Sequence, residues 1–113
     1  MSETAPSPVV VVLSTAPDAS VAERIGRTLV EERLAACANV LPGVTSVFRW
    51  KGAVETEAEV LMVIKTTADT VERTRRRLVE LHPYEVPEVL ALGVVDGHLP
   101  YLDWVRDEVG TDG

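Results

Sequence analysis

The chain has 113 residues, the size of one domain and too short for an enzyme with a separate cofactor domain. Hydrophobic residues make up 46% and charged residues 26%, a composition typical of a folded globular protein rather than a disordered one. The net charge of −7 argues against nucleic acid and anionic membranes as partners, because both repel an acidic surface.

The cysteine content and the N-terminus predict a location. A lone cysteine, Cys37, allows no internal disulfide and so gives no sign of a cross-linked secreted scaffold. The polar, proline-punctuated first eight residues lack the basic and apolar regions of a signal peptide. The longest apolar run, 9–13, is far shorter than the roughly 20 residues that span a bilayer. We therefore expect a cytoplasmic protein, with one domain at 9–109 between a disordered tail at 1–8 and a second tail at 110–113.

The domain begins with a predicted strand and helix. The β-branched run 9–13 is bounded by turn residues and predicts a strand buried on both faces. Ser20 and Glu23 have the spacing of a capping box, in which each side chain bonds the other's backbone N–H. They predict the start of an amphipathic helix that runs to about Leu34. Its buried side is marked by apolar residues at steps of four, Val21, Ile25 and Leu29.

A long hairpin is expected next. Segments 38–50 and 54–66 predict two strands joined at Lys51-Gly52, where glycine supplies the positive φ of a tight turn. Arms of this length reach about 43 Å, whereas a domain of this size has a radius of gyration of only about 13 Å. We therefore expect the hairpin to project from the domain or to bend at Pro42-Gly43.

The last third predicts a helix, a strand and a short helix. Asp69 and Glu72 form a second capping-box spacing, and this helix must stop at His82 because the following proline disfavours helical backbone. Residues 88–95 alternate weakly as a strand, and Pro100 occupies a helix-start position. The order β-α-β-β-α-β plus a terminal helix predicts an α+β, ferredoxin-like sandwich with two helices on one face of an antiparallel sheet.

Several exposed aromatic side chains are expected at a subunit interface. Phe48 and Trp50 lie near the hairpin tip, Tyr84 follows the second helix, and the last helix carries Tyr101 and Trp104. They are predicted to pack between subunits, with stacking on a ligand as the alternative. Because an exposed apolar strand edge is a template for pairing, we expect identical subunits to cover the hairpin.

At this point the sequence resembles a known family. Segments 29–39, 46–52, 57–67, 82–88 and 101–104 resemble, in order and spacing, the CutA divalent-cation-tolerance proteins, which usually carry Tyr at the position of Phe48. The resemblance spans roughly residues 9–109. It implies a ferredoxin-like subunit in a tight homotrimer whose long hairpins pair across subunits. It also implies a response to divalent metal ions such as copper, with no firmly attached catalytic reaction.

His82, Glu85 and Cys37 are the predicted metal ligands. Imidazole suits copper and zinc, and Glu85 follows His82 by three residues, but His82 alternatively ends its helix by bonding the last carbonyls. Cys37 would ligate a soft metal as thiolate or, among alanines, serve as a small buried hydrophobe. In the copper-binding pattern of the resembled family, a Cys stands at the position of Ser14 and a second His at that of Leu81. This chain keeps only His82, so copper or another divalent cation is expected at a weak or differently built site.

Two charged clusters have a ligand-binding and a solvent-facing alternative. Hard cations favour carboxylates, but side chains two apart on a strand project in parallel, so the hairpin glutamates are expected to keep it soluble or to pair with Arg49 and Lys51. These are Glu55, Glu57 and Glu59. The second-helix arginines would grip an anion or form a charge-paired face with neighbouring glutamates. They are Arg73, Arg75, Arg76 and Arg77.

No motif predicts catalysis. The sequence shows neither a Ser or Cys nucleophile with an evident His–acid pair nor a glycine-rich phosphate loop. We therefore expect a non-enzymatic protein that responds to divalent metal ions. The alternative, which rests on analogy of fold, is a small-molecule sensor or signalling scaffold like the trimeric PII proteins, with ligand clefts between subunits walled by the 82–88 loop.

Overall fold

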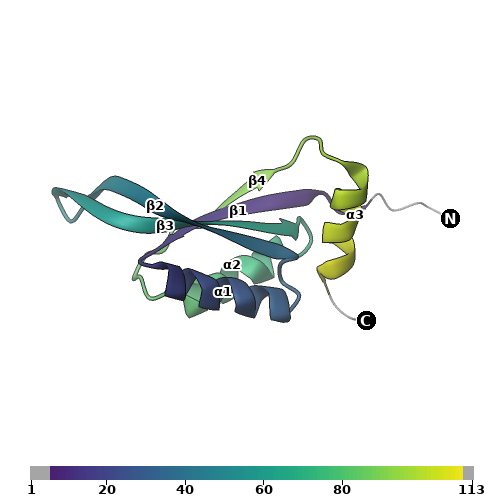
Figure 1. Ribbon diagram of the computed structural model, residues 1–113, viewed down its shortest axis with the longest axis horizontal. Coiled ribbons are helices and arrows are strands. Elements are labelled where there is room, and N and C mark those ends of the chain that lie inside the picture. Colours follow the sequence, from purple (N-terminus) through teal and green to yellow (C-terminus); the bar gives the residue numbers. More distant parts are fainter. Residues whose placement is uncertain (1–5, 111–113) are drawn as a thin grey trace.

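The computed structural model describes residues 6–110, and its element order confirms the predicted mixed fold (Figure 1). The elements are β1 (Val9–Ala16), α1 (Ala19–Glu31), β2 (Cys37–Trp50), β3 (Ala53–Thr67), α2 (Val71–Leu81), β4 (Leu90–Gly93) and α3 (Leu99–Glu108). Residues 1–5 and 111–113 of the two predicted tails lie outside the described part. Of the tail residues inside it, Ser7 and Pro8 accept hydrogen bonds from the backbone N–H groups of Asp69 and Ala68.

The strands form one antiparallel sheet in the order β2-β3-β1-β4. Helices α1 and α2 lie side by side on one face of it, and α3 packs near one end (Figure 1). Because strand side chains alternate between faces, every second residue of β1 from Val10 and of β3 from Val60 is buried under the helices. The fully buried core includes Val12, Ile25, Leu29, Met62, Ile64 and Leu78. None of the helices within residues 6–110 is long and apolar enough to cross a membrane.

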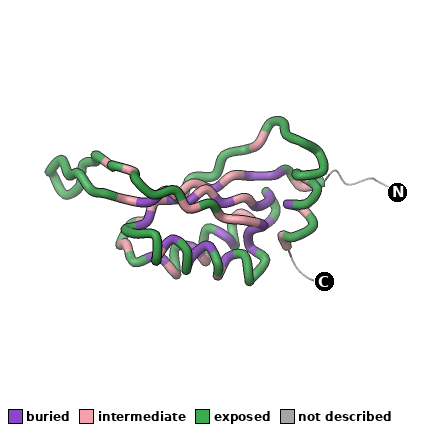
Figure 2. The backbone as a smooth tube through the Cα atoms, in the orientation of Figure 1, coloured by how far each residue is buried: buried purple, intermediate pink, exposed green. Residues whose placement is uncertain are grey.

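The hairpin of β2 and β3 both projects and bends, as expected. It extends beyond the helices, gives the molecule a long axis of 57 Å, and is exposed along its outer half (Figure 2). Its turn has φ of 52° at Lys51 and 85° at Gly52, the left-handed pair of a type I′ turn. The bend is a bulge, since the strand register shifts between Leu41 and Val44, with Gly43 at φ 85°.

Both capping-box predictions were wrong. The N-cap of α1 is Asp18, whose Oδ1 accepts a hydrogen bond from the N–H of Val21 at 2.8 Å, so Ser20 lies inside the first turn. The N-cap of α2 is Thr70, whose side chain caps no backbone group. Asp69 instead accepts a hydrogen bond from the hydroxyl of Thr67 at 2.7 Å. The spacing of hydroxyl and carboxylate side chains does not by itself show which residue occupies the N-cap position.

Two predicted boundaries also shift. Helix α1 ends at Glu31 rather than near Leu34, because Arg33 adopts a left-handed φ of 61°. The N–H of Leu34 then donates to the carbonyl of Leu29 at 2.8 Å, the bond pattern of a Schellman motif. Strand β4 is shorter than the predicted 88–95 segment. The stop of α2 at Leu81, with His82 as its C-cap, is confirmed.

On the sheet face opposite α1 and α2, α3 covers one end and apolar side chains of β1 and β4 remain exposed. Leu90 and Leu92 of β4 pair with Leu13 and Val11 of β1, so their side chains share this face. Leu90 is 54% exposed and Leu92 is 50% exposed. These exposed apolar residues are adjacent rather than scattered, and a continuous patch of this kind marks an interaction site.

Candidate functional site

A groove of about 870 Å³ separates the hairpin from the loop between α2 and β4. The hairpin side includes Phe48, Trp50, Glu55, Glu57 and Glu59, and the loop side includes Tyr84, Glu85, Val86 and Glu88. The groove therefore combines aromatic and aliphatic surface with carboxylates from two segments that lie far apart in the sequence.

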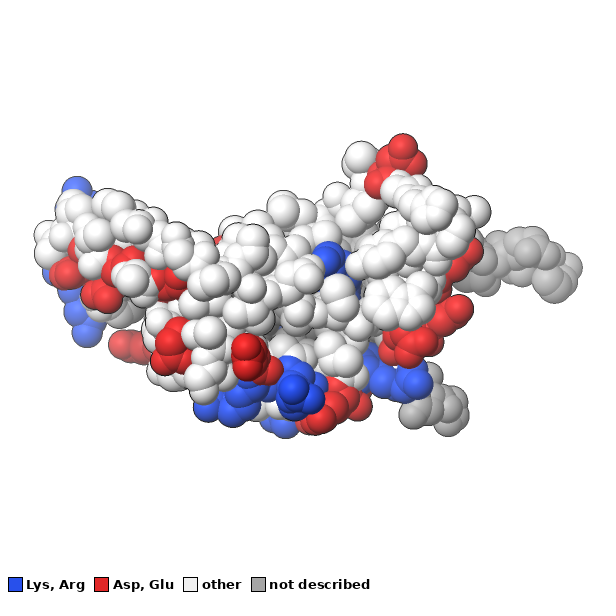
Figure 3. Space-filling model, viewed as in Figure 1, with Lys and Arg blue, Asp and Glu red and all other residues white. Residues whose placement is uncertain are grey.

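Strand register explains why carboxylates and aromatic rings meet on this wall. Phe48 pairs with Glu55, and Ser46 pairs with Glu57, so these side chains share one face of the hairpin. Arg49 pairs with Val54 and lies on the other face, so the expected pairing of Arg49 with the glutamates does not form. In Figure 3 the hairpin end shows Asp and Glu atoms in red together with Lys and Arg atoms in blue.

Tyr84 ties the loop to the hairpin. Its hydroxyl donates to Oε2 of Glu59 at 2.6 Å. Burial, and then the hydrogen bond to the Glu59 carboxylate, raise the pKa of Tyr84 far above its ordinary value of 10.0. The phenol therefore stays protonated and remains a donor at neutral pH, which holds the loop wall of the groove in place.

His82 is buried, and both of its ring nitrogens are in hydrogen bonds. Nε2 lies 2.7 Å from the carbonyl of Thr15, and Nδ1 accepts the N–H of Tyr84 at 3.1 Å. These contacts fit a neutral ring that carries its proton on Nε2. The ring hydrogen-bonds to the carbonyl of Thr15 in β1 rather than to the last carbonyls of its own helix. It therefore presents no free lone pair to the groove. Metal ligation by His82 therefore requires the loss of one of these bonds.

Cys37 lies in a cluster that the sequence did not reveal. Its Sγ is 3.6 Å from the ammonium of Lys65 and 3.8 Å from the hydroxyl of Tyr101, and Lys65 also donates to Oδ1 of Asn39. Burial, and then the hydrogen bond to Cys37, raise the pKa of Tyr101. An ammonium beside the sulfur repels a metal cation approaching it.

The predicted ligands do not converge. Cys37 pairs with Lys65, which pairs with Val11, whereas His82 contacts Thr15, four residues further along β1. That separation is about 13 Å along the sheet. Within residues 6–110, no three His, Cys, Asp or Glu side chains form a group that could hold a metal ion.

Ser14 and Leu81, which stand where the family's copper-binding pattern has Cys and His, supply no metal ligand. Ser14 is fully buried under the helices, and its hydroxyl has no hydrogen-bond partner among residues 6–110. Leu81 is half-buried and packs against the core. The copper-binding pattern that the resemblance implies is therefore not assembled here.

The predicted interface residues lie on the surface of the single chain. Phe48, Trp50, Tyr101 and Trp104 are 39% to 42% exposed, and Tyr84 is half-buried. The rings of Tyr101 and Trp104 lie 5.6 Å apart on α3. Hairpin and α3 thus present aromatic surface at opposite ends of the sheet (Figure 1).

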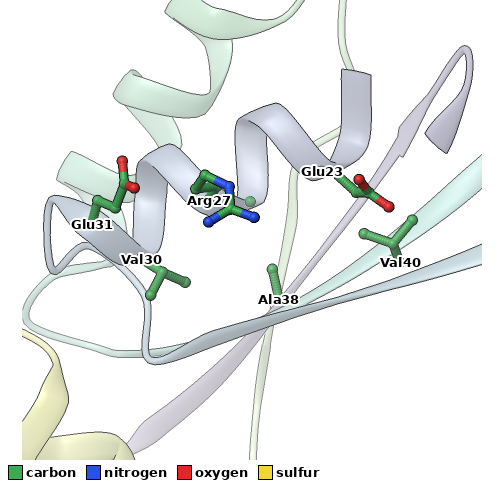
Figure 4. Close-up of a pocket in the computed structure, with 7 residues that line it drawn as sticks. Glu23, Arg27, Val30, Glu31, Ala38 and Val40 are labelled. Carbon is green, nitrogen blue, oxygen red and sulfur yellow. The ribbon is translucent and has the colours of Figure 1, made fainter. Parts of the chain in front are cut away.

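A second hollow, of about 310 Å³, lies between α1 and β2 (Figure 4). Glu23, Arg27 and Glu31 follow the helix along it, and Ala38 and Val40 face them from the strand. Along this flank the Arg27 guanidinium lies between two carboxylates and offsets part of their charge. The larger groove is therefore the stronger candidate site.

Comparison with known proteins agrees with this architecture. The family model described as CutA1 divalent ion tolerance protein matches residues 10–108. The chain is 48% identical over 100 residues to the divalent-cation tolerance protein CutA of Thermus thermophilus, covering 88% of this chain and 97% of that protein. It is also 48% identical over 101 residues to human Protein CutA, covering 89% of this chain but only 56% of the human protein.

A solved structure shows the same fold. The crystal structure of CutA from Xylella fastidiosa is 46% identical and superposes with a TM-score of 0.89 over 92% of this chain and all of that one. The family model matches nearly the whole domain, and relatives similar in sequence and in structure carry the same family name. The chain belongs to the CutA1 divalent ion tolerance family.

Proposed function

We propose that this protein acts in the tolerance of divalent cations as a non-catalytic, cytoplasmic homotrimer. The observation that carries the proposal is the family match over residues 10–108, together with relatives named for divalent-cation tolerance.

Self-association is supported by unpaired surface. The sheet order leaves β2 and β4 as free edges, and Leu90 and Leu92 on the face opposite α1 and α2 are about half exposed. Free edges and apolar faces of this kind pair with other chains unless something covers them. In the proposed trimer, Phe48, Trp50 and Tyr84 of one subunit and Tyr101 and Trp104 of another are buried between subunits.

Direct metal binding is the second part of the proposal. Glu85 is the most accessible of the three predicted ligands, because its carboxylate is exposed and has no hydrogen-bond or ion-pair partner among residues 6–110. His82 joins it only by giving up a hydrogen bond, and Cys37 only by overcoming the charge of Lys65. We therefore propose weak binding of copper or another divalent cation, with additional ligands from a neighbouring subunit.

Titration of the purified protein with Cu²⁺ and Zn²⁺ tests this part. Glu85→Gln is expected to weaken binding about tenfold without lowering the melting temperature, since its side chain supports no other group. His82→Ala is expected to weaken binding and also to destabilise the fold. Identical millimolar binding by the wild type and both variants would reject a dedicated site.

The tolerance function itself is tested in cells. A host that lacks its own copy of the gene should grow less well in elevated copper, and the wild-type chain should restore growth. A matched host that carries the empty vector is the control. Equal growth with and without the chain at every copper concentration contradicts the proposal.

A further inference from the structure

Lys65 places a positive charge on an apolar part of the sheet. It is half-buried on β3, an inner strand, and its side chain lies on the face opposite α1 and α2. It pairs with Cys37 of β2 on one side and with Val11 of β1 on the other, and Leu92 of β4 continues the same row. The neighbours of Lys65 across this row therefore carry no charge that could balance its ammonium.

The Lys65 ammonium has no carboxylate partner within residues 6–110. Its hydrogen bonds go to Sγ of Cys37, at 3.6 Å, and to Oδ1 of Asn39. The ion pairs among these residues join other groups. A thiol and an amide accept hydrogen bonds but do not cancel a charge. A second subunit that covered this face would take water from the ammonium, and that cost is offset only if the subunit brings a negative charge.

The hairpin carries carboxylates that suit this position. Glu55 and Glu57 are exposed and have no ion-pair partner within residues 6–110. Glu55 pairs with Phe48 across the two strands, so a carboxylate lies beside an aromatic ring on one face of the hairpin. Arg49 pairs with Val54 and lies on the other face. One face of the hairpin is therefore both aromatic and acidic.

The sheet end near α3 is aromatic and basic. Tyr101 and Trp104 are exposed, and their ring centroids lie 5.6 Å apart. The hydroxyl of Tyr101 is 3.8 Å from Sγ of Cys37, and the same sulfur contacts the Lys65 ammonium. The two ends of the molecule thus present aromatic rings beside charges of opposite sign. Such surfaces are complementary in charge, which steers association and selects the matching contact.

The two surfaces cannot meet within one chain. Glu57 precedes Lys65 by eight residues of the same strand, which is about 26 Å. The hairpin extends beyond the helices, and the long axis of the molecule is 57 Å against 26 and 23 Å for the others (Figure 2). A contact between the hairpin end and the Lys65 face is therefore a head-to-tail contact between copies, the kind that closes into a ring.

We propose that the hairpin end of one copy lies on the Lys65 face of the next and gives a carboxylate, Glu55 or Glu57, to its ammonium. The cluster of Lys65, Cys37 and Asn39 is incomplete without this residue of the second copy. The inference rests on the proposed self-association and adds which surfaces meet and which charges select them. It does not depend on metal binding.

Zero-length cross-linking tests the contact directly. The sequence has only two lysines, Lys51 and Lys65, so Lys51→Arg leaves Lys65 as the only lysine that can react. A water-soluble carbodiimide joins an amine to a carboxylate in contact with it as an amide. Mass spectrometry of the digest should find Lys65 joined to Glu55 or Glu57, a link that the distance along β3 allows only between subunits. Lys65→Arg in the same background keeps the charge but should abolish the link.

Charge exchange tests whether the pair supports the assembly. Lys65→Glu, and separately Glu55→Lys/Glu57→Lys, should each raise the concentration at which the assembly is half dissociated by about tenfold or more, since like charges then meet. Combining all three changes should restore it to within about threefold of the wild type. Light scattering over a dilution series measures the mass, and circular dichroism confirms the subunit fold. The hairpin variant alters exposed positions only.

The matched control is Glu23→Lys/Glu31→Lys, which makes the same change in net charge at exposed positions of α1. It should shift dissociation by less than about twofold. A wild-type assembly in which Lys65 links only to other carboxylates, or in which the combined variant is no tighter than its parents, overturns this inference and leaves the trimer standing. A wild-type chain that is monomeric at every concentration overturns both.

Discussion

Three side chains decide where the groove's loop lies. His82 holds its start against the carbonyl of Thr15, and Tyr84 holds it against Glu59 on β3. The two rings also pack with centroids 4.6 Å apart. A loop fixed at two points loses less conformational entropy when a ligand binds, which favours a preformed site.

Replacement of Tyr84 with Phe should cost about 1 kcal/mol of unfolding free energy at pH 7, the usual net value of one hydrogen bond. Because the folded protein raises the pKa of Tyr84 above 10.0, this contribution is fully present below pH 10 and is lost as the pH rises beyond it. Urea unfolding from pH 7 to pH 11 measures both effects. Tyr101→Phe is the comparison variant, and an alkaline loss in Tyr84→Phe equal to that of the wild type contradicts the prediction.

Gly26 is required by the contact between α1 and β2. A Cβ at this position would lie 2.9 Å from Cβ of Ala38. Helix propensity alone favours Gly26→Ala by about 1 kcal/mol, but overpacking of this kind costs about 1–3 kcal/mol. We expect a net loss of stability in thermal unfolding. The double variant Gly26→Ala/Ala38→Gly restores the space and should be more stable than Gly26→Ala, and failure to recover would rule out the clash.

At the scale of elements, an exposed ion pair joins α2 to the end of α1, the two helices that cover one face of the sheet. Arg77 of α2 donates from Nε and Nη2 to both carboxylate oxygens of Glu32, which follows α1, at 2.9 and 2.8 Å. Its Nη1 also donates to Glu80 at 3.1 Å. The expectation of a charge-paired α2 face is confirmed for Arg77, and this forked geometry also joins α1 to α2.

Acidification should weaken this link. The hydrogen bond from Arg77 lowers the pKa of Glu32 below its ordinary 4.5, so its contribution to stability is present above pH 4.5 and is lost as the pH falls through the lower, folded-state value. Melting temperatures between pH 7 and pH 3 should fall less steeply in Glu32→Gln than in the wild type. Glu31→Gln, which removes the neighbouring exposed charge, should keep the wild-type slope. Equal slopes in all three proteins exclude a role for the pair.

At the scale of the whole molecule, α1 and α2 bury one face of the sheet, and α3 covers one end of the other. The exposed half of the hairpin, the apolar face of β1 and β4, and the aromatic side chains of α3 are all surfaces that a single chain leaves in water (Figures 1 and 2). Closed symmetry would cover all of them at once. This is the physical reason for the proposed homotrimer.

Leu92→Glu should therefore dissociate the assembly without unfolding the subunit. A charge at a buried contact costs several kcal/mol, while Leu92 is half exposed in the isolated chain and contributes little to its core. Light scattering coupled to size exclusion measures the mass, and circular dichroism confirms the fold. Val95→Glu is the matched control, since Val95 is fully exposed. A wild-type monomer in dilute solution, or an unchanged mass for Leu92→Glu, contradicts the proposed interface.

Local patterns in the sequence were sufficient for the elements and their order. Alternation along β3, the turn at Lys51-Gly52 and the proline after His82 each act within a few residues, so they can be read without knowledge of the rest of the chain. They also placed the three hairpin glutamates on one face and predicted that the hairpin projects or bends. The resemblance in five segments then led to the family.

Only the tertiary structure decided which side chains meet. The ammonium next to Cys37, the carbonyl that receives His82, the glutamate that receives Tyr84 and the loop wall of the groove all come from segments distant in the sequence. Such contacts depend on strand register and on the bulge between Leu41 and Val44, and a one-residue slip would reverse every face. Spacing along the chain therefore suggested a ligand set of His82, Glu85 and Cys37, whereas register brought together a groove of separated carboxylates and aromatic rings.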